Sequence, residues 1–343
     1  MSRVGILTCG GDCPGLNAAI RAVTRKLIIS YDYEVLGIKN GYNGLIEGDV
    51  QPLSLYSVSG VLPRGGTILG TSRKNPLQIK NGKEAILENL NRFEIDSLVV
   101  IGSKSAIETA NVLSRSGVRT VCIPGTIDND IPGTDFTIGF DTAVTIATRA
   151  IDMVHTTAES HHRIIVVELM GYDTGWIATY AGLAGGADCI LIPEVKFTLD
   201  ETAALLKKRH KRRKFSIVVV AEGAIPDDVK DFRALSSKTD ALGNSYVGSI
   251  GEFVGVELAK RTGMETRVTT LGYLQRGGSP SVPDRILATR LGVAAADKIK
   301  NKEFSVMVGV VGDKIATTPI DKVTGQVKKV NLEMFDAAST FFG

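Results

Sequence analysis

The sequence PGTIDND at Pro124–Asp130 places two carboxylates and a hydroxyl directly after the apolar, β-branched run Thr120–Ile123. Such a run predicts a buried strand. The proline and glycine that follow the motif, Pro132 and Gly133, exclude a regular helix there. The acidic loop therefore leaves the C-terminal end of a strand, which is where open α/β sheets bind their ligands.

Asp128 and Asp130 are the chemically informative side chains of this loop. Two acids separated by one residue on a rigid turn suit either abstraction of a proton or positioning of a metal ion. The same spacing is also typical of an Asx-turn, in which both carboxylates cap backbone N–H groups. Spacing alone leaves the catalytic and the structural interpretation equally open.

Length and composition indicate a globular protein of two domains that resides in the cytoplasm. The chain has 343 residues, of which 43% are apolar and 22% are charged. Its net charge of +3 does not favour nucleic acid as a partner. We see no signal peptide and no apolar run long enough to span a membrane. The four cysteines lie mostly in apparent strands, which is typical of reduced, packed thiols.

Strand-like and helix-like segments alternate along the chain, which predicts an α/β fold of two doubly wound, mainly parallel sheets. Strands are expected at residues 4–9, 34–38, 97–101, 120–123, 163–169, 189–193, 215–221, 265–271 and 305–311. A turn is expected at 40–44, a surface loop or insertion at 227–245, and a mixed tail after 311. We expect the larger domain to contain residues 1–139 and 275–310, and the smaller one 140–274 and 311–343.

Three glycine-rich loops indicate binding of phosphate groups, and the first and the third follow predicted strands. The first, Gly10–Asn17, leads from a strand into a helix and can turn its backbone N–H groups toward an anion. It lacks the G-x-G-x-x-G spacing and the P-loop lysine, so a purely structural turn stays open as an interpretation. The other two, at 62–73 and 272–280, carry arginines, which bind phosphate bidentately.

Together these motifs resemble those of the phosphofructokinase A family, in the family's order and from about Val4 to Lys300. The matching segments are Gly10–Asn17, Gly65–Thr67, Pro124–Asp130, Gly133–Asp135, Val167–Gly171, Glu222–Gly223, Glu265–Arg267 and Leu271–Pro280. A polar stretch after Glu222 is similar to the longer bacterial subgroup, which contains ATP- and pyrophosphate-dependent enzymes. The resemblance implies a larger domain that binds the phosphoryl donor and a smaller domain that binds the sugar phosphate.

The resemblance implies a glycolytic transfer of phosphate from ATP with Mg²⁺, or from pyrophosphate, to the 1-hydroxyl of fructose 6-phosphate. Asp128 would take the proton of that hydroxyl. Thr126 would hold the sugar or the transferring phosphoryl group, and Asp130 would act on the metal side. The residues that correspond to the family's sugar-phosphate site are Arg163, Met170, Gly171, Glu222, Arg267, Tyr273 and Arg276.

The resemblance also implies an oligomer. In the family, arginines at the positions of Arg163 and Arg267 cross a subunit interface and bind the 6-phosphate. Arg276 and Tyr273 would bind the same phosphate. Glu222 would accept hydrogen bonds from the sugar. We therefore expect a homo-oligomer, a dimer or a tetramer, or a hetero-oligomer with an intact paralogue. Without the motif context, Arg163 and Arg267 would be interpreted as ordinary ion pairs.

The donor side departs from the family pattern. The residues expected to bind the donor are Gly11, Tyr42, Arg73, Lys104 and Ser105. The family's Gly-Gly-Asp-Gly-Ser/Thr motif corresponds here to Gly102–Ala106, so Lys104 stands where the family has a magnesium-binding Asp. Lysine could replace the charge of the metal on a phosphate, but it could not hold Mg²⁺.

Two further positions bear on the donor and on activity. Tyr172 stands where the family usually has an arginine on the transferred phosphate, and loss of that arginine removes stabilisation of the transition state. Gly125 stands where pyrophosphate users typically have lysine, so this position favours ATP or no donor at all. The sequence thus favours an active, ATP-dependent phosphofructokinase. The alternative is a catalytically weak paralogue that binds fructose 6-phosphate as a regulatory or partner subunit, and a kinase of another sugar phosphate is a third interpretation.

A basic run at Lys207–Lys214 ends a predicted helix. In bacterial relatives a basic cluster at this place, with arginines of the first helix, binds a nucleotide or phosphoenolpyruvate effector. The corresponding residues are Arg21, Arg25, Lys211 and Arg213, which implies allosteric regulation. His155 and Leu55 stand where some relatives have arginines, and a solvated basic helix end is an equally open interpretation.

Overall fold

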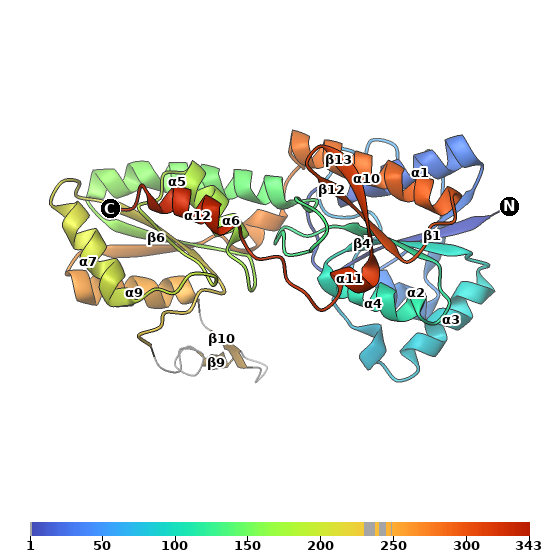
Figure 1. Cartoon of the computed structure of the whole chain (residues 1–343), viewed down its shortest axis with the longest axis horizontal. Coiled ribbons are helices and arrows are strands. Elements are labelled where there is room, and N and C mark those ends of the chain that lie inside the picture. Colours follow the sequence, from blue (N-terminus) through green and yellow to red (C-terminus); the bar gives the residue numbers. More distant parts are fainter. Residues whose placement is uncertain (1, 230–236, 240–244, 248) are drawn as a thin grey trace. The chain divides into compact units, whose positions relative to one another are not determined.

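The computed structural model describes residues 2–229, 237–239, 245–247 and 249–343, which fold into two units with separate sheets. Unit 1 comprises Met1–Thr142 and Arg276–Lys328, and unit 2 comprises Ala143–Gln275 and Lys329–Gly343. Figure 1 shows helices on both faces of each sheet. The prediction of two doubly wound α/β sheets is therefore confirmed.

Unit 1 contains a mixed sheet of seven strands in the order β13-β12-β5-β4-β1-β2-β3. The inner strands are parallel, and the edge strands β3 and β13 run antiparallel to their neighbours. Strands β4 and β5 are buried along their whole length, as their continuous apolar sequences require. The strands are β1 (Arg3–Cys9), β2 (Glu34–Ile38), β3 (Val50–Leu53), β4 (Ser97–Gly102), β5 (Thr120–Pro124), β12 (Val306–Val311) and β13 (Lys314–Pro319).

The helices of unit 1 lie on the two faces of this sheet. Figure 1 shows α1 and α10 together on one face and α2, α3, α4 and α11 on the other, and α1 packs on α10. Their apolar sides bury into the sheet, and their polar sides face solvent. The helices are α1 (Leu16–Tyr31), α2 (Gly41–Glu47), α3 (Gly82–Arg92), α4 (Lys104–Ser114), α10 (Val282–Lys300) and α11 (Ile320–Val323), with a short 3₁₀ turn, η1 (Pro76–Gln78).

The position of the site in unit 1 follows from the strand order. The chain leaves β1 for β2 on one side of the sheet, whereas β4 and β5 lie on the other side, so the order reverses between β1 and β4. The register pairs Cys9 with Gly102, and Gly102 with Pro124. Three strands therefore end on one row, and their following loops meet at a topological switch point, where ligands bind.

Unit 2 contains a parallel sheet of four strands in the order β11-β6-β8-β7. Figure 1 shows α5, α6 and α12 on one face and α7 and α9 on the other, and α7 packs on α9. The strands are β6 (Ile164–Leu169), β7 (Cys189–Leu191), β8 (Ser216–Ala221) and β11 (Thr266–Thr270). The helices are α5 (Phe140–His161), α6 (Trp176–Ala184), α7 (Leu199–His210), α9 (Ile250–Thr262) and α12 (Leu332–Ser339), and the 3₁₀ helix η2 (Gly272–Arg276) ends at the unit boundary.

Several local expectations differ from the structure. Residues 40–44 begin helix α2 instead of a turn, because Tyr42 is a fully buried anchor and Gly44 allows close approach to the Lys39 carbonyl. The expected loop at 227–245 lies largely outside the described residues, and its described parts form β9 (Ser237–Thr239), which pairs with β10 (Ser245–Val247). Within the described ranges, no helix combines the length and the apolar composition that a bilayer span needs.

The domain boundary after residue 310 also differs from the structure. Residues 314–319 form β13, which pairs antiparallel with β12 and so adds a strand to the sheet of unit 1. The chain passes to unit 2 only after Lys328, whereas the other transitions, after Thr142 and Gln275, lie close to the expected ones. The tail gave no clear periodicity, so its strand was not expected.

Crowding at the row of strand ends generates the first prediction. A Cβ on Gly102 would overlap the carbonyl oxygen of Cys9. We expect Gly102→Ala to lower the free energy of unfolding of unit 1 by about 2 kcal/mol, because the backbone of β1 or β4 must shift. Thermal unfolding followed by circular dichroism measures this change.

Gly60→Ala is the matched control for this substitution. Gly60 has a positive φ of 68° with no neighbouring atom within 4 Å of the added Cβ, so only backbone strain of about 1 kcal/mol is expected. Equal losses for the two variants would contradict the crowding at Gly102.

Candidate active site

The loop after β5 holds the predicted acid Asp128 in a buried, hydrogen-bonded position. Asp128 is 7% exposed and Thr126 is 2% exposed. The Thr126 hydroxyl donates to Asp128 Oδ2 at 3.0 Å and accepts the Asp128 N–H at 3.3 Å. Thr126 therefore orients the carboxylate, and the predicted pair of a hydroxyl and an acid is brought together.

Asn129, which the sequence analysis did not single out, holds the backbone of this loop. It is fully buried with a left-handed φ of 52°. Its Oδ1 accepts the N–H of Thr137 at 3.0 Å, and its Nδ2 donates to the Asp135 carbonyl at 3.1 Å. The Thr137 hydroxyl donates to the Thr126 carbonyl at 2.6 Å. The loop is therefore rigid on both sides of Asp128.

Two guanidinium groups of unit 1 face the first glycine loop. A Cβ on Gly11 would lie 2.5 Å from Arg276 Nη1 and 3.2 Å from Arg73 Nη2. Arg276 is 3% exposed, donates Nη1 to the Asp12 carbonyl at 3.2 Å, and leaves Nε without a hydrogen-bond partner among the described residues. Buried positive charge without a carboxylate suits an anionic ligand such as a phosphate.

Arg276 was expected to bind the 6-phosphate with Arg163 and Arg267, and this role stays a prediction. The boundary between the units passes between Gln275 and Arg276. The guanidinium of Arg276 consequently joins Gly11 and Arg73 in unit 1. Only the tertiary path of the chain decides this assignment.

Lys104 lies at the first position of α4, directly beside the row of strand ends. The preceding Ser103 contacts Gly10, and its hydroxyl lies 3.1 Å from that of Ser105. The Lys104 side chain is partly exposed and makes no hydrogen bond or ion pair with described residues. Its ammonium is therefore available to a ligand.

These residues do not fit a magnesium ion at the family's donor motif. The motif supplies an ammonium and two hydroxyls where carboxylates would be required. Within the described ranges, no cluster of three or more His, Cys, Asp or Glu residues is arranged to hold a metal. The charge at this loop suits the phosphate of a donor rather than a divalent cation.

Tyr42 does not lie where a donor-binding residue is expected. Its side chain is fully buried, and its hydroxyl donates to the Ala106 carbonyl of α4 at 2.9 Å. Burial raises the pKa of Tyr42 well above its usual value. The contact joins α2 to the start of α4, so the side chain supports the donor loop from inside and has no surface with which to touch a donor.

In unit 2, Glu222 joins the loops that follow β6 and β8. Its Oε1 accepts the N–H groups of Gly171 at 3.1 Å and Tyr172 at 2.7 Å. The N–H of Met170 donates to Gln275 Oε1 at 3.2 Å. The structure thus brings Met170, Gly171 and Glu222 together, while the Tyr172 side chain, 55% exposed, extends into solvent.

Arg163 and Arg267 meet on one carboxylate. Arg163 Nε lies 2.8 Å from Glu265 Oε2, and Arg267 Nη2 lies 2.6 Å from Glu265 Oε1. The hydrogen bond from Arg163, with the charges of both arginines, lowers the pKa of Glu265. The two arginines predicted to bind phosphate are therefore neighbours, and Tyr273 is 75% exposed elsewhere in unit 2.

The expected effector residues are divided between the two units. Arg21 and Arg25 lie on α1 of unit 1, and Lys211 and Arg213 follow α7 of unit 2. Arg213 Nη1 lies 3.7 Å from Glu159 Oε1, with both side chains largely exposed. An effector site at these residues stays a prediction.

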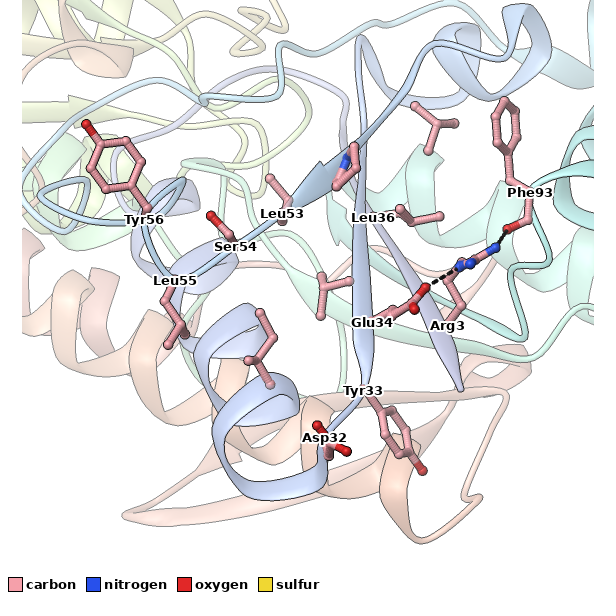
Figure 2. Close-up of a pocket in the computed structure, with 14 residues that line it drawn as sticks. Arg3, Asp32, Tyr33, Glu34, Leu36, Leu53, Ser54, Leu55, Tyr56 and Phe93 are labelled. Carbon is pink, nitrogen blue, oxygen red and sulfur yellow. Dashed lines mark hydrogen bonds and ion pairs between the residues drawn. The ribbon is translucent and has the colours of Figure 1, made fainter. Parts of the chain in front are cut away.

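A separate groove of about 900 Å³ in unit 1 contains none of the predicted catalytic or substrate residues. Figure 2 shows Leu53, Leu55 and Tyr56 on its wall, with Arg3 bonded to Glu34 and to the Phe93 carbonyl. Because its lining is mainly apolar and Arg3 is already paired, this groove does not suit a phosphate.

The sequence analysis also missed two buried carboxylates that organise the loops. Asp284 of α10 accepts the N–H groups of Gly139 and Thr142, each at 2.8 Å. Glu168 of β6 accepts the Ser249 hydroxyl and the Gly251 N–H at the start of α9, and burial raises its pKa. The signal in the sequence was a charged residue within an apolar strand for Glu168 and an acid at the start of a helix for Asp284.

The fold and these loops define a doubly wound α/β protein with anion-binding loops at the carboxyl ends of its strands. The family model for phosphofructokinase matches residues 3–299. The chain belongs to the phosphofructokinase family.

Relatives with different phosphoryl donors are equally similar to this chain. It is 46% identical over 341 residues, covering 99% of this chain and 100% of the relative, to a pyrophosphate–fructose 6-phosphate 1-phosphotransferase from Amycolatopsis mediterranei. It is also 46% identical over 337 residues, covering 95% and 92%, to an ATP-dependent 6-phosphofructokinase from Spirochaeta thermophila. Overall identity therefore does not decide the donor.

A solved structure of phosphofructokinase from Saccharomyces cerevisiae matches with a TM-score of 0.83 and 32% identity. The match covers 94% of this chain and 45% of the yeast chain. This chain thus corresponds to less than half the length of that yeast chain.

The contacts of Glu222 generate the second prediction. We expect Glu222→Ala to lower the free energy of unfolding of unit 2 by about 1–2 kcal/mol, because two N–H groups lose their acceptor. Urea unfolding followed by the fluorescence of Trp176, the one tryptophan of the chain, reports on unit 2.

Glu222→Gln is the matched control for the alanine variant. The amide keeps an oxygen acceptor for Gly171 and Tyr172. Its loss of stability is expected to be less than about half of that for alanine. Equal losses, or none for alanine, would show that these hydrogen bonds do not stabilise unit 2.

Proposed function

We propose that this chain transfers a phosphoryl group to the 1-hydroxyl of fructose 6-phosphate and forms fructose 1,6-bisphosphate. The observation that carries the proposal is the buried Asp128, oriented by Thr126 on a rigid loop at the switch point of unit 1. Membership of the phosphofructokinase family and the activities of its relatives with ATP or pyrophosphate support it.

The reaction requires one proton transfer and stabilisation of phosphate charge. The sugar 1-oxygen attacks the terminal phosphorus of the donor, the bond from that phosphorus to the leaving phosphate breaks, and Asp128 accepts the hydroxyl proton. Arg73, Arg276 and Lys104 would stabilise the negative charge of the transferring and leaving phosphates. Asp130 and the loop amides would orient the donor, while Gly11 lets the donor approach the backbone.

Unit 2 would bind the sugar phosphate. Glu222 accepts the N–H of Gly171, and the neighbouring Met170 N–H donates to Gln275. These hydrogen bonds hold Glu222, Met170 and Gly171 together in a polar group that suits the sugar hydroxyls. Arg163 and Arg267, held side by side by Glu265, suit the 6-phosphate. Tyr273, from the matched segment Leu271–Pro280, would also contact it. We further propose that these arginines act across a subunit interface, so that the working protein is a homo-oligomer.

We propose ATP rather than pyrophosphate as the donor. Gly125 is buried, and a Cβ there would lie 2.8 Å from Leu16 Cδ2, so a lysine would not fit without rearrangement. The chain therefore lacks the lysine that is typical of pyrophosphate users at this position, which supports ATP. Relatives of both donor classes are equally similar, so titration calorimetry with ATP, with and without Mg²⁺, and with pyrophosphate is the direct test.

A second candidate function is a catalytically weak paralogue that binds fructose 6-phosphate as a regulatory or partner subunit. Lys104 and Tyr172, both on the donor side, favour this candidate, because a metal ligand and an arginine are absent together. Binding of fructose 6-phosphate without binding of either donor would support the paralogue and reject the kinase.

The role of Asp128 generates the third prediction. Asp128→Asn keeps the shape of the side chain but removes the base, so we expect kcat to fall about 10²- to 10⁴-fold while fructose 6-phosphate still binds. A coupled assay of fructose 1,6-bisphosphate formation measures the change. The control is Asp321→Asn, on exposed α11, which should retain full activity. Turnover of Asp128→Asn within a few-fold of the parent would rule out this role.

The charge of Lys104 generates the fourth prediction. The double variant Lys104→Asp with Ser103→Gly restores the family's acid and glycine, and we expect it to bind MgATP about tenfold more tightly, or ~1.4 kcal/mol. Calorimetry measures the affinity, and Ser103→Gly alone is the control for the change of loop shape. No gain for the double variant would show that Lys104 does not weaken binding of the metal nucleotide.

A further inference from the structure

Lys328 binds the loop that carries the two predicted catalytic aspartates. Its ammonium donates to Asn129 Oδ1 at 3.0 Å, to the Thr134 carbonyl at 2.9 Å and to the Asp135 carbonyl at 2.8 Å. Its backbone N–H donates to the Asp130 carbonyl at 2.8 Å. The three donors of the ammonium thus have three acceptors, all on one loop.

The contact is partly buried and lies outside the segment that the family model matches. The family model ends at residue 299, whereas Lys328 ends the segment of unit 1 that follows β13 and α11. Burial lowers the pKa of Lys328 to about 8, against the opposing effects of Asp135 and Asp130. Lysine side chains are mostly exposed in proteins, so a partly buried ammonium with three acceptors on one loop is unusual.

The acceptor Asn129 is the residue between the two aspartates. Its left-handed backbone, with φ 52°, turns the chain from Asp128 to Asp130. Asn129 Oδ1 accepts both the Thr137 N–H and the Lys328 ammonium, each at 3.0 Å. Lys328 therefore holds the side chain of Asn129, which in turn holds the turn between Asp128 and Asp130. The backbone N–H of Lys328 also donates to the Asp130 carbonyl.

We propose that Lys328 is a positioning residue for Asp128 and Asp130: its ammonium and backbone N–H hold the loop so that both carboxylates face the reacting groups. The inference rests on the proposed phosphotransferase function. It adds to that function a requirement for a residue from the end of unit 1, which touches no substrate and acts through Asn129.

A positioning role predicts an effect on turnover in the folded protein. We expect Lys328→Met, which keeps the length of the side chain but removes the charge and the donors, to lower kcat about 10- to 100-fold. The KM for fructose 6-phosphate should change less than about threefold, because the sugar residues lie in unit 2. Lys329→Met, at the exposed next position, is the control and should behave as the parent.

The measurement is steady-state kinetics of the full chain at a temperature at which calorimetry shows each variant to be folded. A lower stability of Lys328→Met with an unchanged kcat would mean a structural role only and would overturn the proposal. If Lys328→Met does not fold, Lys328→Gln, which removes the charge and leaves at most two of the three donors on a shorter side chain, is measured against the same criteria.

A double-mutant cycle tests whether the effect passes through Asn129. If it does, Lys328→Met should add little to the loss of kcat caused by Asn129→Ala, whereas fully additive losses would overturn the mechanism. A parent chain without turnover would reject the proposed function and this inference with it. An active parent with an equally active Lys328→Met would reject this inference alone.

Discussion

The register of three parallel strands is the constraint on which the rest of unit 1 depends. Cys9, Gly102 and Pro124 lie on one row across β1, β4 and β5. This row is close-packed, because any side chain at position 102 would meet the carbonyl of Cys9. The glycine loop, the start of α4 and the aspartate loop all begin within a few residues of it, so one backbone alignment places all three at the topological switch point.

The loops at this row divide the chemistry by charge. The loop after β1 carries Gly11 and meets the guanidinium groups of Arg73 and Arg276, and the loop after β4 carries Lys104. Among the described residues none of these three cations forms an ion pair with a carboxylate, which suits phosphate. The loop after β5 carries the buried Asp128, whose carboxylate suits the acceptance of a proton. In the resemblance, the position of Lys104 belongs to a metal ligand. Here that position carries a lysine, so the charge at the start of α4 is positive.

Sequence patterns predicted most of the fold and part of the site. Continuous apolar runs predicted β4, β5, β6 and β8, because buried parallel strands need no alternation. The patterns failed where tertiary packing overrides local signals. Gly41 and Gly44 were taken for a turn, although both belong to α2 and allow close backbone contacts. Tyr42 was assigned to the donor from the resemblance, although packing places it inside the unit.

The sequence by itself determined most strands of both sheets, the glycine loops and the acidic loop, because each is a local property of a few consecutive residues. Only the tertiary structure decided that Arg276 joins Gly11 in unit 1 and that Lys328 closes on Asn129. Asn129 and Lys328 are 199 residues apart. A hydrogen bond over such a separation depends on the path of the whole intervening chain, and no local periodicity encodes that path.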